Sequence, residues 1–216
     1  MNDLKGKVVL ITGAGQGFGA AMLPALAKQG AIIAANDITT INLDSPIEQI
    51  ITAGGRAKAY DADVCKKLAL QTMLGDVLED FGRIDVLINH ASVQPRMPIL
   101  EMDEWDWHRT LDVNLTATFL ATQSVGRMMR EQGGGKILNI GLVESGEGLD
   151  KRSAYLSSKM GIESFTLAAA SELAEHKVYV NALLPNKSNM EESVQAALRL
   201  ILGDQTAQVI KIEEEK

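Results

Sequence analysis

The sequence predicts an α/β fold in which helices flank a parallel β-sheet. Short runs rich in β-branched residues alternate with longer stretches of helical character along the whole chain, as in repeated strand-helix units. A glycine-rich turn between the first run and the first helical stretch is a second indication. The chain has 216 residues, 46% of them hydrophobic, which suffices for one buried core and is short for two domains. We expect a single domain over residues 1–216.

Seven runs are expected to form strands. They are KVVLI (7–11), AIIAAN (31–36), AKAYD (57–61), IDVLIN (84–89), KILNI (136–140), VYVNALL (178–184) and AQVIKI (207–212). The first helical stretch, 17–30, has apolar residues at helical spacing, and the second, 43–55, offers Asp44 or Ser45 as an N-cap before Pro46. Later helices are expected over 153–175 and 192–204.

The longest helical stretch runs from 103 to about 131. Asp103 is its expected N-cap, and the glycines at 133–135 should end it. Trp105 and Trp107 near its start are interpreted as packing residues rather than as a stacking platform.

Composition disfavours several functions. The formal net charge is −7 and Lys and Arg form no cluster, so nucleic-acid binding is not expected. No stretch reaches the roughly 18 apolar residues of a membrane span, and the start has too short an apolar run for a signal peptide; we expect a cytoplasmic protein without a membrane partner. The single cysteine, Cys65, has neither a disulfide partner nor zinc-ligand spacing. It is interpreted as a residue near a helix start, and no metal site is expected.

The segment TGAGQGFG after the first run has the pattern T-G-x-x-x-G-x-G. It places Gly13, Gly17 and Gly19, with Gln16 and Phe18 between them, at a strand-to-helix turn. Glycines let the backbone approach a pyrophosphate closely, and the free N–H groups of the following helix stabilise its charge. A merely tight turn would look the same locally, so the pattern alone leaves both interpretations open.

Asp37 favours the nucleotide-binding interpretation. It closes the second expected strand, where a carboxylate can accept hydrogen bonds from an adenosine ribose. The same charge would repel a 2′-phosphate, and the glycine turn contains no Arg or Lys. We therefore expect NAD as the cofactor rather than NADP.

Tyr155 and Lys159 lie four residues apart in a helix-compatible stretch, so they share one helical face. An unperturbed tyrosine has a pKa of about 10, and nearby positive charge lowers it toward the range useful for proton exchange. Alone this spacing is weak evidence. Only three histidines are present, and we find no credible Ser-His-Asp arrangement.

Together these features resemble the short-chain dehydrogenases/reductases over nearly the whole chain. The matching segments, in order, are TGAGQGFG, Asp37, DADV at 61, INHAS at 88, DVNLTATF around 114 and YLSSK at 155. The resemblance implies a Rossmann-like, doubly wound, seven-stranded parallel sheet of order 3-2-1-4-5-6-7 with helices on both faces. It also implies a nicotinamide cofactor and interconversion of a carbonyl and an alcohol by a tyrosine.

The resemblance assigns further site residues. Asp63 and Val64 correspond to adenine contacts, although Asp63 could equally cap the next helix. Asn89 and Ala91 correspond to the segment beside the cofactor. His90 and Ser92 depart from the usual pattern, and we interpret His90 as a hydrogen-bonded structural residue.

The catalytic residues implied by the resemblance are Tyr155 as acid/base, Lys159 as the group that tunes it, and Asn114, which would hold a water or Lys159 in a proton relay. The family usually has a serine about thirteen residues before the tyrosine, and Leu142 occupies that position. Loss of such a donor can cost on the order of 3 kcal/mol, or roughly a hundredfold in rate. Ser145 is a possible substitute.

Two other positions bear on the site. Ser153 is interpreted as a helix cap. Asn186 stands where the family has the glycine of a Pro-Gly segment, and only 31 residues follow Pro185. This leaves little sequence for the usual substrate lid.

Two functions remain open. The first is an NAD-dependent oxidoreductase acting on a 3-oxoacyl compound or another ketone. The second is a weakly active or inactive NAD-binding subunit or scaffold of a hetero-oligomer. By the resemblance, helices 103–131 and 153–175 would form the contact of a homodimer or homotetramer.

Overall fold

The computed structural model describes residues 3–142 and 148–213. Its seven strands form one sheet of order β3-β2-β1-β4-β5-β6-β7, and every neighbouring pair is parallel. The expected strand order is therefore confirmed. The strands are β1 (Val8–Ile11), β2 (Ile32–Asp37), β3 (Arg56–Asp61), β4 (Val86–Asn89), β5 (Gly135–Ile140), β6 (Val178–Leu184) and β7 (Val209–Lys211).

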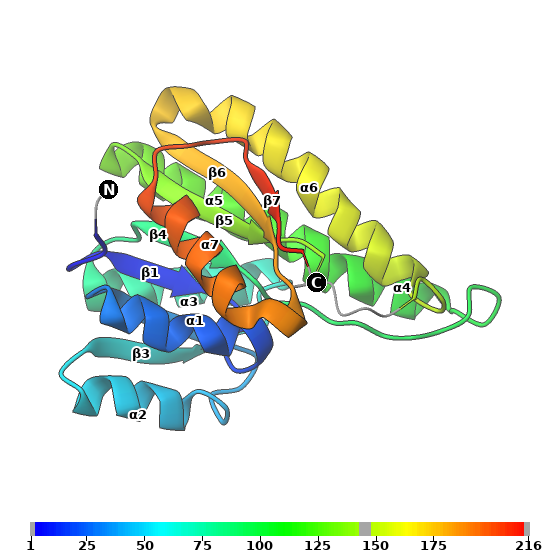
Figure 1. Cartoon of the computed structure of the whole chain (residues 1–216), viewed down its shortest axis with the longest axis horizontal. Coiled ribbons are helices and arrows are strands. Elements are labelled where there is room, and N and C mark those ends of the chain that lie inside the picture. Colours follow the sequence, from blue (N-terminus) through cyan, green and yellow to red (C-terminus); the bar gives the residue numbers. More distant parts are fainter. Residues whose placement is uncertain (1–2, 143–147, 214–216) are drawn as a thin grey trace.

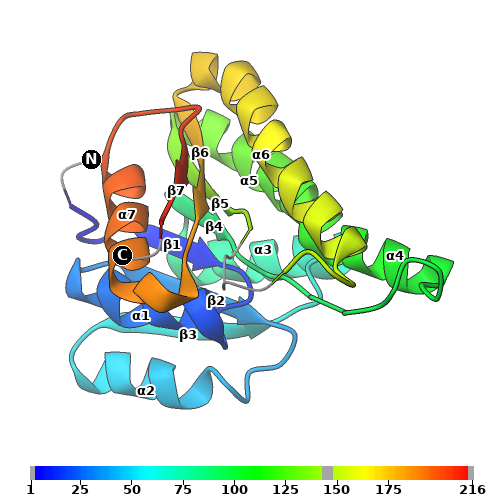
Figure 2. The same cartoon turned by 45° about the vertical axis from the view of Figure 1, so that its right-hand side comes forward.

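Helices connect successive strands and cover both faces of the sheet (Figures 1 and 2). The α-helices are α1 (Gly17–Lys28), α2 (Asp44–Thr52), α3 (Lys67–Phe81), α4 (Glu104–Leu111), α5 (Ala117–Gln132), α6 (Ser153–Leu173) and α7 (Met190–Leu202). Shorter helical turns are η1 (Asp112–Thr116), η2 (Ala174–His176) and η3 (Lys187–Asn189).

Alternation along the strands sorts the core into two layers. In β1, Val9 and Ile11 pack with α1, α2 and α7, while Val8 and Leu10 pack with α3, α5 and α6. All four side chains are buried, as expected for a strand covered on both faces. The β-branched runs of the sequence therefore form the middle of a three-layer structure.

Helix boundaries agree with the sequence in some places and differ in others. The Asp103 carboxylate accepts from the Asp106 N–H at 2.7 Å and caps α4, and Gly133 ends α5 in the left-handed conformation, as expected. Neither Asp44 nor Ser45 caps α2, because the helix already includes both and Leu43 precedes it.

The long stretch from 103 to 131 is not one regular α-helix. The π-helical turn η1 separates α4 from α5, and such turns widen a helix by one residue and often mark functional sites. The prediction that Trp105 is a packing residue is wrong for the core of this chain, since its side chain is 69% exposed. Trp107 is half-buried.

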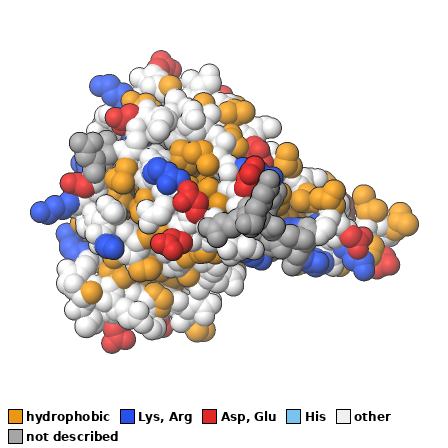
Figure 3. All heavy atoms as spheres, in the orientation of Figure 1, with side chains coloured by type: hydrophobic (Ala, Val, Ile, Leu, Met, Phe, Trp, Pro, Cys, Tyr) orange, Lys and Arg blue, Asp and Glu red, His pale blue; other side chains and the backbone are white. Residues whose placement is uncertain are grey.

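The segment 95–103 and α4 project from one end of the sheet layers (Figure 1). Ile99, Leu100 and Trp105 are exposed there, and hydrophobic side chains gather at that end in the space-filling view (Figure 3). In the part of the chain that the structure describes, no helix combines the length and apolar character needed to cross a membrane.

Candidate active site

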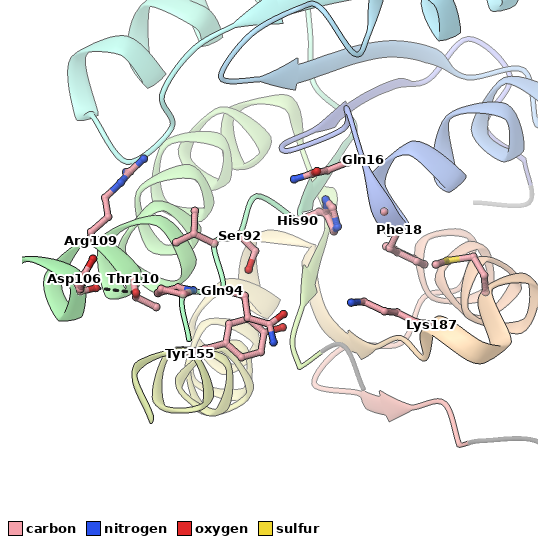
Figure 4. A pocket seen from close by; sticks show the side chains of 14 residues that line it. Gln16, Phe18, His90, Ser92, Gln94, Asp106, Arg109, Thr110, Tyr155 and Lys187 are labelled. Atoms are coloured by element: carbon pink, nitrogen blue, oxygen red, sulfur yellow. Dashed lines mark hydrogen bonds between the residues drawn. The ribbon is translucent and has the colours of Figure 1, made fainter. Parts of the chain in front are cut away.

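The larger of two adjoining pockets, of about 880 Å³, opens beyond the carboxyl ends of β1 and β4. β1 and β4 are neighbours in the sheet although their connections lead in opposite directions, and this switch point is where α/β sheets bind ligands. Side chains from five parts of the chain converge there, one of them the loop after β4 (Figure 4). They include Gln16 and Phe18 of the glycine turn, Arg109 and Thr110 of α4, Tyr155 of α6 and Lys187 of η3.

A smaller pocket of about 160 Å³ is lined by half of the predicted cofactor residues. Gly13, Gln16, Asp37, Asp63, Val64 and Ala91 all contribute to its wall. Gln16, His90 and Arg109 line both pockets. The two spaces therefore adjoin beside the glycine turn, one at the end of β2 and the other at Tyr155.

Asp37 and the glycine turn are tied together. One carboxylate oxygen of Asp37 accepts from the Gly15 N–H at 2.8 Å, and the other accepts from the Ile38 N–H at 2.7 Å. A Cβ atom at position 15 would lie 2.6 Å from Asp37 Oδ2, so a larger residue there would push the carboxylate away from this N–H. Gly15 thus belongs to the site, although the sequence motif does not require it.

The turn leaves open space where a phosphate group fits. Gly13 and Gly17 have positive φ angles of 65° and 57°, a backbone region that favours glycine. A Cβ atom at Gly17 would meet nothing within 4 Å, and Gly17 and Phe18 both line the larger pocket. The N–H groups of a first helical turn have no partners within the helix, so this end of α1 can accept an anion.

Tyr155 and Lys159 lie together on α6, as predicted. Tyr155 lines the larger pocket, while Lys159 is buried behind it with 1% of its surface exposed. The Lys159 ammonium donates to the Ile140 carbonyl at 3.1 Å and lies 5.9 Å from the centre of the Tyr155 ring. Burial lowers the pKa of Lys159 to about 7, because a low-dielectric surrounding disfavours the charged form.

Asn114 lies in η1 and is fully buried. Its Oδ1 accepts from the Val93 N–H at 2.8 Å, and its Nδ2 donates to the Val93 carbonyl at 3.0 Å and to Ser158 Oγ at 2.9 Å. The side chain therefore links the loop after β4 to α6. A direct side-chain bond from Asn114 to Lys159, one of the two expected arrangements, is not formed.

Asn89 is not brought to either pocket. Its amide donates to Asn139 Oδ1 at 2.8 Å and to Thr122 Oγ1 at 3.1 Å, so it links β4 to β5 and α5. Gly19 lies under the turn, where its N–H is bonded to the His90 ring at 3.3 Å. His90 is hydrogen-bonded on both ring nitrogens, in agreement with the structural role expected for it.

Two polar residues do not form the helix caps that were considered for them. Asp63 does not cap α3, which Lys66 precedes; its carboxylate accepts from the Cys65 N–H at 3.3 Å instead. Ser153 is not a helix cap either, since it lies inside α6 and its buried hydroxyl has no hydrogen-bond partner.

Leu142 follows β5 and is half-buried, and it is not among the described residues that line the larger pocket. Ser145 lies outside the described residues. The connection from β6 to α7 consists of Pro185, Asn186 and the turn η3, as the short sequence after Pro185 suggested. Within the described residues, no group of three or more His, Cys, Asp or Glu side chains is arranged to hold a metal ion.

Sequence reasoning missed Gln94, Arg109, Arg152 and Lys187. Arg152 is buried, with its guanidinium 5.0 Å from the centre of the Tyr155 ring. When the Gln94 amide oxygen faces this group, it accepts from two guanidinium nitrogens at 3.0 and 2.9 Å. The contact between Gln94 and Arg152 joins residues far apart in the chain, and no local spacing signals it.

Comparisons with known proteins agree with this geometry. The short chain dehydrogenase family matches residues 7–198. The chain is 38% identical over 188 residues to 5-keto-D-gluconate 5-reductase of Escherichia coli K12, covering 86% of this chain and 74% of that protein. It is 35% identical over 199 residues to 3-oxoacyl-[acyl-carrier-protein] reductase of Synechocystis, covering 91% and 81%.

A solved structure of NAD+-bound xylitol dehydrogenase superposes with a TM-score of 0.86 at 27% identity, covering 97% of this chain and 98% of that one. The family match, the identities and the strand order lead to one conclusion. The chain belongs to the short-chain dehydrogenase/reductase family of oxidoreductases.

Proposed function

We propose that this protein interconverts a ketone and a secondary alcohol with NAD(H), using Tyr155 as the proton donor and acceptor. The observation that carries the proposal is the placement of Tyr155. Its ring lines the larger pocket opposite the glycine turn, with the ammonium of Lys159 behind it. A substrate oxygen in this pocket can therefore approach both a phenol and the place where a cofactor would lie.

The residues present fit a dinucleotide. Gly17 and Phe18 would hold its pyrophosphate at the start of α1, and the smaller pocket between Asp37, Asp63 and Val64 would hold its adenosine. The cofactor, when bound, supplies or accepts the hydride. Asp37 still has acceptor capacity after its two backbone bonds, because a carboxylate offers about four lone-pair sites. It would accept from a ribose diol and repel a 2′-phosphate, which supports NAD over NADP.

The tyrosine and lysine supply the proton chemistry. While charged, Lys159 favours the phenolate form of Tyr155 and so lowers the energy of moving the proton. Because burial brings the pKa of Lys159 to about 7, this lysine can also exchange protons near neutrality. Asn114 fixes the loop after β4 against α6 through Val93 and Ser158, so its role is to position the helix that carries both residues.

We propose a small hydroxylated ketone as the substrate, such as a keto sugar acid. Ser92, Gln94, Thr110 and Lys187 give the larger pocket polar groups that can bind hydroxyl and carboxylate oxygens. The relative named 5-keto-D-gluconate 5-reductase and the NAD+-bound xylitol dehydrogenase point to the same class. A 3-oxoacyl thioester, as the name of the Synechocystis relative suggests, is the competing substrate.

A substrate panel tests this assignment. NADH oxidation would be followed with 5-keto-D-gluconate, with a four-carbon ketose and with a 3-oxobutanoyl thioester, and each assay would be repeated with NADPH. We expect the highest kcat/KM with NADH and a hydroxylated ketone. Highest activity with the thioester would contradict the substrate class. Binding of NADH without turnover of any ketone would favour the scaffold function instead.

A further inference from the structure

The imidazole of His90 bridges the two ends of the glycine turn. Its Nδ1 lies 2.8 Å from the Gly13 carbonyl oxygen, and its Nε2 lies 3.3 Å from the Gly19 backbone nitrogen. A carbonyl only accepts and a backbone N–H only donates, so Nδ1 must carry the hydrogen and Nε2 must be bare. These two partners therefore require a neutral ring in a single tautomer.

The surroundings of the ring favour the same state. Burial lowers the pKa of His90 to about 4, and the charge of Lys159 acts in the same direction. The backbone bonds to Gly13 and Thr12 and the carboxylate of Asp37 act in the opposite direction and are outweighed. His90 is thus neutral at physiological pH.

The turn is packed directly onto this ring. A Cβ atom at Gly19 would lie 2.6 Å from both the Gly13 oxygen and His90 Nδ1, and one at Gly13 would lie 2.7 Å from the Ala91 Cα. Thr12 Oγ1 also accepts from the N–H groups of His90 and Ala91, at 3.1 and 3.2 Å. The position of the turn above the end of β4 is therefore set by contacts with residues 90 and 91.

These contacts determine which N–H groups remain for a ligand. Three N–H groups begin α1, those of Gly17, Phe18 and Gly19, and none has a partner within the helix. The Gly19 N–H donates to His90 Nε2. The N–H groups of Gly17 and Phe18, which line the larger pocket, remain available to a ligand.

We propose that His90 positions the cofactor indirectly, through the glycine turn. The neutral, Nδ1-protonated ring of His90 holds Gly13 and Gly19 at the separation in which the Gly17 and Phe18 N–H groups meet a pyrophosphate. This proposal rests on the proposed use of a dinucleotide. It extends the expected structural role to a specific function, since loss of the bridge should weaken pyrophosphate binding more than adenosine binding, although His90 also lines the smaller pocket.

Calorimetric titration of His90→Leu with three probes tests the proposal. NADH and ADP-ribose contain the pyrophosphate, and adenosine does not. We expect roughly tenfold weaker binding of NADH and ADP-ribose, the equivalent of about one hydrogen bond, with a clearly smaller loss of adenosine affinity. His90→Asn, which keeps a donor and an acceptor, should lose less affinity. His176→Leu, in the turn η2 that follows α6, should lose none.

The outcomes separate this proposal from the proposed function. An equal loss of affinity for all three probes in His90→Leu, or no loss for ADP-ribose, would overturn the role of His90. Neither result would contradict NADH binding by the wild type. A wild type that binds neither NADH nor ADP-ribose would overturn both. If His90→Leu does not fold, the comparison is made with His90→Asn. Nitrogen NMR of the wild-type imidazole should show a protonated Nδ1 and a bare Nε2 at pH 7, and the opposite tautomer would also overturn the proposal.

Discussion

The Asp37 carboxylate accepts a hydrogen bond from the Gly15 N–H at 2.8 Å, so the end of β2 and the glycine turn form one unit. This bond gives Asp37 two roles that a substitution can separate. One role is to support the turn, and the other is to present negative charge to the ribose of a cofactor.

Asp37→Asn should reduce the preference for NADH over NADPH. An asparagine oxygen can still accept from Gly15, but the charge that repels a 2′-phosphate is gone. We expect NADPH affinity to rise at least several-fold and NADH affinity to fall, as measured by titration calorimetry. Asp37→Ala, which also loses the bond to Gly15, should weaken both. A wild type that binds NADPH as tightly as NADH would refute the cofactor assignment.

Lys159 should make stability depend on pH above neutrality. Burial lowers its pKa from 10.5 to about 7 in the folded protein, so the unfolded chain binds more protons than the folded chain between these values. The free energy of unfolding therefore gains a contribution as the pH rises from about 7 to about 10.5. Lys159→Met removes it.

Urea unfolding at intervals from pH 6.5 to 9.5 measures this effect. The difference in unfolding free energy, wild type minus Lys159→Met, should rise with pH. Lys28→Met, at the end of α1 and exposed, serves as a control with no such trend. Parallel curves for wild type and Lys159→Met would show that the lysine is not buried as described.

The fold could be predicted because the pattern that encodes it is local. Runs such as 86–88 are apolar on both faces of a strand, and Gly133 ends a helix through its own backbone freedom. The sheet order came from the family resemblance, since spacing alone does not specify which strands are neighbours.

The site could be predicted only in part, because much of it depends on contacts across the sheet. Gly13 and His90 meet because β1 and β4 are adjacent, which no local pattern reveals. Arg152 looks like an ordinary charged residue before a helix, yet it is buried against Tyr155. Ser153 has the residue type of a cap, but α6 begins at that residue and its hydroxyl is left without a backbone N–H to accept.

Leu142→Ser should increase the rate of ketone reduction. Negative charge on the substrate oxygen grows during hydride transfer, so a second donor would stabilise the transition state more than the ground state and raise kcat. The family resemblance places this donor at position 142, although Leu142 is not among the described residues that line the larger pocket. The gain should not exceed roughly a hundredfold and should be smaller if the void left by leucine lets the serine point away. Steady-state kinetics measure it, and a fast wild type slowed by this substitution would contradict the prediction.

The faces of α5 and α6 should form a contact between copies of the chain. Phe119 and Leu167 are 42% and 48% exposed on these helices, and Phe119 packs edge-on against Phe165. We expect a dimer or tetramer at micromolar concentration by analytical ultracentrifugation. Phe119→Glu should shift it toward monomer, whereas Leu68→Glu, on the exposed side of α3, should not. A monomeric wild type would contradict this prediction.

Tyr155→Phe tests the central claim most directly. The substitution removes only the hydroxyl, so NADH affinity should stay within about twofold of wild type while kcat for the best ketone of the panel falls by at least 10²-fold, the lower end of the usual contribution of an acid/base group. Tyr179→Phe, on β6 and packed under Lys136, is the matched control and should retain activity. Steady-state NADH oxidation by the three proteins is the measurement. Loss of turnover confined to Tyr155→Phe is the predicted result, and retained turnover in that variant would contradict the proposed catalytic role of this tyrosine.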